Sequence, residues 1–215
     1  MDDAEITKKY DFLESEDGVV LFSQLVEALK KGTHIQYDGD KALFLYLDKY
    51  IDNLTAYFKR HENISIVPSG SGNGLYYFPL YLSASGRNYS VERSSLPKEH
   101  ILIALLLYKA YYIDHNIELT SVKKFLTLIR VDMPDLKKHV QRLLVKAKGT
   151  NERFTEKNEN QIAAEVQRAF RNFHKLRWID LKEDDFIILP AFQRITREFA
   201  DYINHIDEWF KNEEA

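Results

Sequence analysis

Residues 160–189 read NQIAAEVQRAFRNFHKLRWIDLKEDDFIIL. On a helical wheel of about 100° per residue, Arg168, Arg171 and Lys175 fall on one face and the apolar residues gather on the opposite face. One side can therefore pack on a core while the other offers cations to a phosphate backbone. Two short apolar runs then flank the polar turn 182–185, which is typical of a β-hairpin. A basic helix that leads into a hairpin is the layout of the DNA-contacting part of a winged-helix domain, although three cations on a surface helix also suit an ordinary solvated face.

The composition of the chain indicates a folded protein. Its 215 residues are 45 % hydrophobic and 13 % aromatic, enough for one large domain or two small ones. The absence of cysteine excludes disulfides, thiolate zinc sites and thiol nucleophiles, and it suits a reducing compartment. The first residues are acidic where a signal peptide would be basic and then apolar, and the longest apolar run, residues 101–108, is far shorter than the roughly 20 residues that span a bilayer. We therefore expect a soluble, cytoplasmic protein without membrane contact.

The net charge of −3 hides an uneven distribution of charge along the chain. Residues 120–182 carry 15 Lys and Arg against 7 Asp and Glu, a balance of +8. The balances of residues 1–60, 61–119 and 183–215 are −4, −1 and −6. The basic block coincides with the predicted DNA-contacting part, which favours nucleic-acid binding. The acidic blocks either restrain non-specific binding or face other protein surfaces.

Hydrophobic periodicity divides the chain into two unequal copies of a helix, helix and hairpin pattern. Helices are predicted over 18–31 and 40–60, before a hairpin of strands 64–67 and 75–78 with a Gly- and Ser-rich tip. After a polar segment come a helix that Pro97 starts, a shorter helix capped by Thr120 or Ser121, the basic helix with its hairpin, and a last amphipathic helix. The fold predicted is mainly α with small β-hairpin wings (α+β), arranged as tandem winged-helix domains. Its parts are a flexible arm (1–18), a first winged helix (19–82), a linker (83–95), a second winged helix with a basic face (96–190) and a C-terminal helix (191–215).

No arrangement of residues predicts an enzyme. The Gly-rich segment 69–74 lacks the Lys-Ser/Thr of a phosphate loop and lies between two strands, where a phosphate loop would lead from strand to helix. The seven histidines show no metal-ligand spacing, and His34, just after a helix end, is expected to satisfy backbone groups. No combination of nucleophile, base and oxyanion donor is recognisable. We expect no catalytic residue, no metal site and no cofactor.

The cations of residues 120–182 are the candidate DNA-binding residues. Lysines among arginines, without a clear cluster of base-reading Asn or Gln, favour contact with the DNA backbone over sequence readout. An ordinary solvated basic face is the alternative. The candidates are Lys123, Lys124, Arg130, Lys137, Lys138, Arg142, Lys146, Lys148, Arg168, Arg171, His174, Lys175 and Arg177.

Five segments of the chain carry a family resemblance. They are residues 21–35 (LFSQLVEALKKGTHI), 57–60 (YFKR), 76–80 (YYFPL), 93–96 (RSSL) and 166–178 (VQRAFRNFHKLRW). In this order and with similar separations they resemble the MukE and MksE family, the accessory subunits of MukBEF-type bacterial condensins. The family's basic pair before a Leu matches His174 and Lys175, so one of the two cations is a histidine here. Arg177 stands where the family tends to have Gly, and it either adds a phosphate contact or simply occupies the turn.

The resemblance implies a homodimer of tandem winged-helix subunits with no catalytic residue. It implies binding to the central region of a kleisin (MukF or MksF type) and, through the kleisin, to an SMC ATPase (MukB or MksB type). It also implies non-specific DNA contact by basic residues of the second winged helix, at the nucleoid, in chromosome condensation and segregation. The long polar C-terminal tail of MukE is missing, which favours the MksE branch, and that branch can also act in plasmid defence.

Aromatic residues of the first domain are the candidate partner surface. Aromatic side chains are enriched at interfaces, although ordinary core packing is the alternative for each of them. Two other functions remain open: a free-standing winged-helix transcription regulator, and a purely protein-binding pair of domains whose basic face meets an acidic partner. The candidate partner-binding residues are Tyr37, Phe44, Tyr46, Tyr50 and Tyr57.

Overall fold

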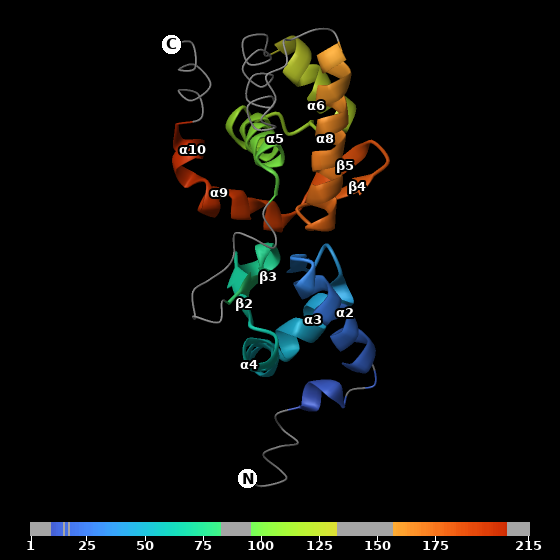
Figure 1. The fold of residues 1–215 in the computed structure, drawn as a ribbon, viewed down its shortest axis with the longest axis vertical. Helices are drawn as coiled ribbons and strands as arrows, with labels where there is room; N and C mark the ends of the chain where they lie inside the picture. Colours follow the sequence, from blue (N-terminus) through green and yellow to red (C-terminus); the bar gives the residue numbers. More distant parts are fainter. Residues whose placement is uncertain (1–9, 15, 17, 83–95, 133–156, 206–215) are drawn as a thin grey trace. The chain divides into compact units, whose positions relative to one another are not determined.

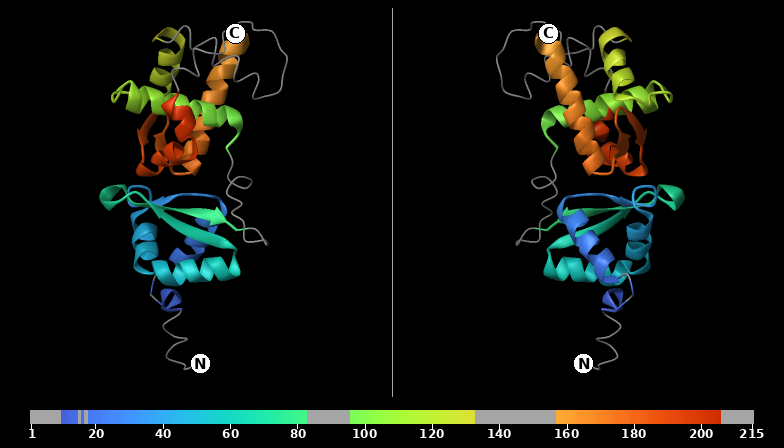
Figure 2. Two further views of the ribbon diagram at one scale, coloured as in Figure 1. Left: turned by 90° about the vertical axis from the view of Figure 1, so that its left-hand side faces the viewer. Right: turned by 90° about the vertical axis from the view of Figure 1, so that its right-hand side faces the viewer.

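The computed structural model describes residues 10–14, 16, 18–82, 96–132 and 157–205. The chain divides into two compact units, each built from helices and a small antiparallel sheet (Figures 1 and 2), so the fold is α+β as predicted. Unit 1 comprises Met1–Ser95, Leu176–Trp178 and Leu189–Ala191, and unit 2 comprises Leu96–Lys175, Ile179–Ile188 and Phe192–Ala215. The helix expected near residues 134–146 and the loop expected at 148–153 lie outside the described residues.

Unit 1 packs its helices around a three-stranded antiparallel sheet of strand order β1-β3-β2. The predicted hairpin is confirmed, and its tip needs glycine: at Gly70 the φ angle is +77°, and a Cβ there would lie 2.1 Å from the Gly74 carbonyl oxygen. The elements are a 3-10 turn (Asp11–Leu13), α2 (Gly18–Lys30), β1 (Ile35–Gln36), α3 (Lys41–Lys49), α4 (Ile51–His61), β2 (Ile64–Ser69) and β3 (Tyr76–Tyr81).

The single helix predicted over residues 40–60 is wrong, because the chain breaks at Tyr50 between α3 and α4. Asp40 caps α3, with its side chain accepting a hydrogen bond from the Leu43 N–H at 3.0 Å. Leu47 before the break and Leu54 after it are both fully buried. The apolar period therefore continues through the break, which explains why periodicity predicted one helix.

The core of unit 1 reaches into the predicted N-terminal arm. Phe12 is fully buried against Phe22 and Tyr57, and its carbonyl accepts a hydrogen bond from the Tyr46 hydroxyl at 2.9 Å. Burial of a phenylalanine contributes about 2 kcal/mol, enough to order a short turn. Residues 11–13 are thus part of the packed unit.

Unit 2 places α8 against α5 and α6, and the chain then forms a hairpin. Ser121, one of the two predicted caps, accepts a hydrogen bond from the Lys124 N–H, and it pairs with Asp185 as an isolated β-bridge beside the hairpin. The expected last helix is instead a 3-10 turn and two five-residue helices that meet at Phe199. The elements are α5 (Lys98–Tyr108), a π-helical turn (Lys109–Ile113), α6 (Val122–Thr127), a second π-helical turn (Leu128–Asp132), α8 (Lys157–Lys175), β4 (Ile179–Lys182), β5 (Asp185–Ile188), the 3-10 turn (Pro190–Gln193), α9 (Arg194–Glu198) and α10 (Ala200–Asn204).

Candidate nucleic-acid and partner interfaces

The α8 helix presents the cations that the helical wheel predicted. Arg168, Arg171 and Lys175 are exposed, whereas Phe170 and Phe173 on the other side are fully buried. The Phe170 ring packs against aromatic rings of α6 and β5, with centroids 5.4 Å from Phe125 and 5.0 Å from Phe186. Packing of the apolar face therefore fixes which side of α8 carries positive charge to the surface, and the prediction of an amphipathic basic helix is confirmed.

A buried polar cluster holds α8 on α5. His100 and Glu165 are each only 4 % exposed, and His100 Nε2 lies 3.1 Å from Glu165 Oε1. The Asn172 amide donates to His100 Nδ1 at 3.0 Å, so the neutral imidazole carries its proton on Nε2 and donates it to Glu165. The Arg168 guanidinium donates to the other Glu165 oxygen at 3.4 Å. Sequence reasoning missed His100 and Glu165, because no motif connects residues 65 positions apart.

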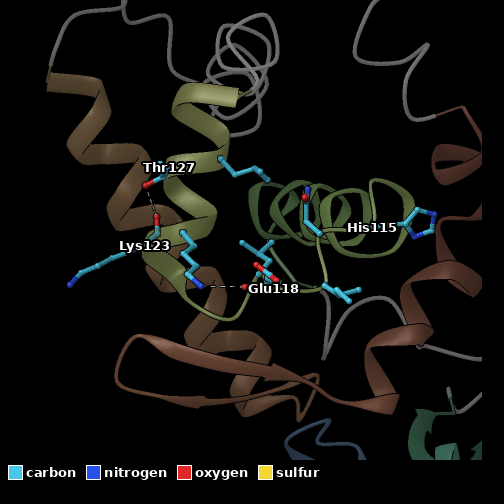
Figure 3. Close-up of a pocket in the computed structure, with 9 residues that line it drawn as sticks. His115, Glu118, Lys123 and Thr127 are labelled. Atoms are coloured by element: carbon cyan, nitrogen blue, oxygen red, sulfur yellow. Dashed lines mark hydrogen bonds between the residues drawn. The ribbon is translucent and has the colours of Figure 1, made fainter.

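The second set of exposed cations lies on α6, which packs beside α8 within unit 2 (Figure 1), and on the π-helical turn that follows α6. Lys123, Lys124 and Arg130 are all exposed. Figure 3 shows Lys123 extending away from Glu118, whose carbonyl accepts a 3.5 Å hydrogen bond from Lys124 Nζ. Lys123 and Lys124 border an open hollow of about 650 Å³, whose other lining residues are His115, Asn116, Ile117, Glu118, Leu119, Thr127 and Leu128. Lys137, Lys138, Arg142, Lys146 and Lys148 lie outside the described residues.

His174 is fastened to the hairpin. Its Nδ1 accepts a hydrogen bond from the Leu181 N–H at 3.1 Å and lies 3.8 Å from Asp180 Oδ1. His174 therefore holds β4 in place through the Leu181 amide.

Arg177 occupies a left-handed backbone conformation, with φ of +60°. Glycine adopts this conformation without steric cost, which accounts for the glycine that the resemblance led us to expect here. The Arg177 carbonyl accepts a hydrogen bond from the side chain of Gln36, and its guanidinium-bearing chain is half-buried.

Two buried polar side chains hold this part of the chain in unit 1. His34 Nδ1 lies 2.8 Å from the Leu176 carbonyl oxygen, and His34 Nε2 lies 3.5 Å from the indole nitrogen of Trp178. The indole can only donate, so Nδ1 carries the proton and donates to Leu176. Gln36 accepts from the Ala191 N–H at 2.9 Å. The expectation that His34 satisfies backbone groups is confirmed.

The five candidate partner-binding aromatics differ in exposure. Tyr37 is 42 % exposed with Lys41 Nζ 5.1 Å from its ring centroid, and Tyr50 and Tyr57 are half-buried. Phe44 and Tyr46 lie in the core at 8 % and 5 % exposure. Burial raises the pKa of Tyr46 to about 12, with smaller contributions from Tyr50 and Asp11. Of the five, only Tyr37, Tyr50 and Tyr57 are partly exposed.

An α+β fold of two units with an exposed basic helix does not by itself define a function, because one fold can host many functions. A protein-family comparison is more specific. The model for condensin complex protein MksE matches residues 20–199, and the chain belongs to this family, as the resemblance predicted. It is therefore a subunit of a condensin complex. No curated protein matches the chain.

Within the part of the chain that the structure describes, every helix is too short or too polar to span a membrane. Nor do three His, Asp or Glu side chains converge within those residues in a way that could hold a metal ion.

Proposed function

We propose that this condensin subunit is a non-enzymatic scaffold of tandem winged-helix domains that contacts the DNA backbone through α8. The order of elements supports the winged-helix assignment. Unit 1 runs helix, strand, two helices and hairpin, with β3 between β1 and β2. Unit 2 runs α5, the bridge at Ser121, α6, α8 and a hairpin, which is the same order with a bridge in place of the first strand.

One observation carries the DNA proposal: three cations share the exposed face of a helix whose other face is buried in the core. Arg168, Arg171 and Lys175 are spaced along α8 so that they can follow a phosphate backbone without reading bases. Lys123, Lys124 and Arg130 would extend this surface, and so would Arg177 and the predicted cations Lys137, Lys138, Arg142, Lys146 and Lys148. His174 would support the surface by holding β4.

The partners follow from the family. We propose that the chain forms a homodimer and binds a kleisin of the MukF or MksF type. Through the kleisin it would join an SMC ATPase of the MukB or MksB type, in the cytoplasm at the nucleoid. Tyr37, Tyr50 and Tyr57 offer partly exposed rings for partner contact, and the buried Phe44 and Tyr46 would support them from the core. Chromosome segregation and plasmid defence both suit this assembly.

Salt-dependent binding to a random 30-base-pair duplex tests the DNA proposal. We expect the variant Arg168→Glu/Arg171→Glu/Lys175→Glu to bind more weakly, with the slope of log K against log salt smaller by about 3, since each phosphate contact contributes about 0.9. The matched control is Lys41→Glu/Lys49→Glu/Lys59→Glu, which reverses three exposed lysines of unit 1 and should leave the slope nearly unchanged. Equal binding by wild type and the α8 variant would remove the site assignment.

The same experiment separates the other two functions. A transcription regulator requires at least about a thousandfold preference for some operator over random DNA. A purely protein-binding pair of domains would not bind DNA at moderate salt.

Affinity purification from the protein's own cells, with mass spectrometry, tests the proposed assembly. A kleisin and an SMC ATPase in near-fixed ratio are expected, and a homodimer without partners would contradict the proposal.

A further inference from the structure

The outer side of α4 carries a small hollow, which we name the α4 pocket. It is lined by Tyr10, Asn53, Ala56, Tyr57, Arg60 and His61, and its volume is about 130 Å³. Sites for small molecules and cofactors typically measure about 300 to 1,000 Å³, so the α4 pocket has room for a single side chain rather than a cofactor. Ala56, the smallest of the lining residues, is exposed and leaves the hollow open.

The walls of the pocket are held in place by unit 1. Tyr57 packs on the rings of Phe12, Phe22 and Phe58, with centroids 5.8, 5.3 and 5.6 Å away, and it also contacts the His61 ring at 4.8 Å. The Asn53 amide is occupied, because it donates to Asp11 Oδ1 at 3.0 Å. Rigid aromatic and arginine side chains around a preformed hollow are the features that concentrate binding energy at protein interfaces.

The charges beside the pocket are predominantly positive. Lys59, Arg60 and His61 form the last turn of α4, and all three are exposed. The next residue, Glu62, is already paired with Lys30 at 2.9 Å, and Asp52 lies at the opposite end of the helix. An anionic group that approaches this end of α4 therefore meets cations first.

We propose that the α4 pocket binds a partner-protein segment that places one apolar side chain in the hollow and a carboxylate against Arg60 and His61. The inference rests on the proposed role of unit 1 in partner binding, and it names the chemistry of that partner. A protein segment suits the site better than DNA does, because two tyrosine rings and Ala56 make part of the hollow apolar, and an apolar side chain fills such a surface where a phosphate does not.

Site-specific photocrosslinking in the protein's own cells tests the proposal. The full chain carries p-benzoylphenylalanine at Lys59, beside the pocket, or at Gln24, an exposed position on α2 that serves as the control. We expect Lys59 to crosslink to one protein peptide that is acidic and contains an apolar residue, and Gln24 not to do so. A DNA adduct, a neutral or basic peptide, or equal crosslinking at both positions would overturn the proposal.

Two substitutions show whether the crosslink depends on the pocket. Ala56→Leu fills the hollow and Arg60→Glu reverses the charge at its edge, and each should lower the crosslink yield at least tenfold. Ala42→Leu makes the same change at an exposed alanine of α3 and should leave the yield unchanged. Circular dichroism confirms that the variants are folded, and an unchanged yield in folded Ala56→Leu would overturn the proposal. If condensin subunits still co-purify in that case, the pocket fails while the proposed function stands.

Discussion

The helices α4 and α8 both lead directly into a hairpin, yet their exposed faces differ. Within α8 the cations are spread along the helix, at Arg168, Arg171 and Lys175. Within α4 they are confined to the last turn, next to a pocket lined partly by tyrosine. A repeated order of elements thus supports two different surfaces, and the exposed face rather than the fold decides which partner each unit can meet.

The two units also differ in the kind of polar side chain that they bury. Unit 1 buries tyrosines whose hydroxyls donate to carbonyls, as Tyr81 does to Leu29 at 2.7 Å. Unit 2 buries the pair His100 and Glu165 between two helices, α5 and α8. A buried carboxylate needs its partners far more than a buried phenol does, so unit 2 should be the more sensitive to loss of a polar partner.

The largest effect should come from removing an aromatic ring from either core. Phe58 of α4 and Phe170 of α8 are both fully buried, and each Phe→Ala substitution should lower the free energy of unfolding by about 3 to 5 kcal/mol. Hydrogen exchange with mass spectrometry should show lost protection only in the substituted unit, and Ile187→Ala, at a 67 % exposed position, should change little. Loss of protection in both units would show that they unfold as one.

The buried pair of unit 2 should produce the next largest effect. Glu165→Leu leaves His100 without its acceptor and should cost about 2 to 4 kcal/mol in urea unfolding. Adding His100→Leu should recover much of this loss, because two apolar side chains need no hydrogen bonds. In unit 1, Tyr81→Phe should cost only about 1 kcal/mol. If the double variant lost as much free energy of unfolding as the two single variants together, the two side chains would not act as a pair.

High pH should weaken unit 1 through Tyr46. Burial raises the pKa of this phenol to about 12, whereas in the unfolded chain it titrates near 10. The folded state therefore holds a proton that the unfolded state loses, so this contribution is complete below about pH 10 and disappears as pH rises through 12. Between pH 10 and 12, the free energy of unfolding of Tyr46→Phe should therefore fall by on the order of 2 kcal/mol less than that of the wild type, as measured by urea unfolding. An unchanged slope would show that Tyr46 does not titrate with unfolding.

Sequence patterns predicted those features of the molecule that repeat with a short period. The face of α8 and the two hairpins follow from alternation of apolar and polar residues, and the position of His34 follows from its place after a helix end. The break at Tyr50 could not be predicted in this way, because α3 and α4 bury one continuous apolar stripe.

Tertiary contacts decided the remaining features of the candidate sites. Whether Tyr46 or Tyr57 faces a partner depends on how Phe12 packs beneath them, and no local pattern contains that contact. Likewise, the bond between His174 and the Leu181 amide of β4 joins residues that no sequence motif connects. The residue types indicated which interactions each side chain could make. Contacts with residues distant in the sequence determined which of those interactions form.

The smallest effect concerns the turn between helix and hairpin, which both α4 and α8 make with a left-handed residue. After α4 this residue is Asn63, with φ of +54°, and after α8 it is Arg177, with φ of +60°. Asparagine tolerates this conformation better than other residues with a side chain, whereas arginine is strained there. Arg177→Asn should therefore raise the free energy of unfolding by about 0.5 to 1 kcal/mol, and Asn63→Arg should lower it by a similar amount. Thermal unfolding of both variants checks the pair, and a loss of stability in Arg177→Asn would mean that contacts of the arginine side chain outweigh its backbone strain.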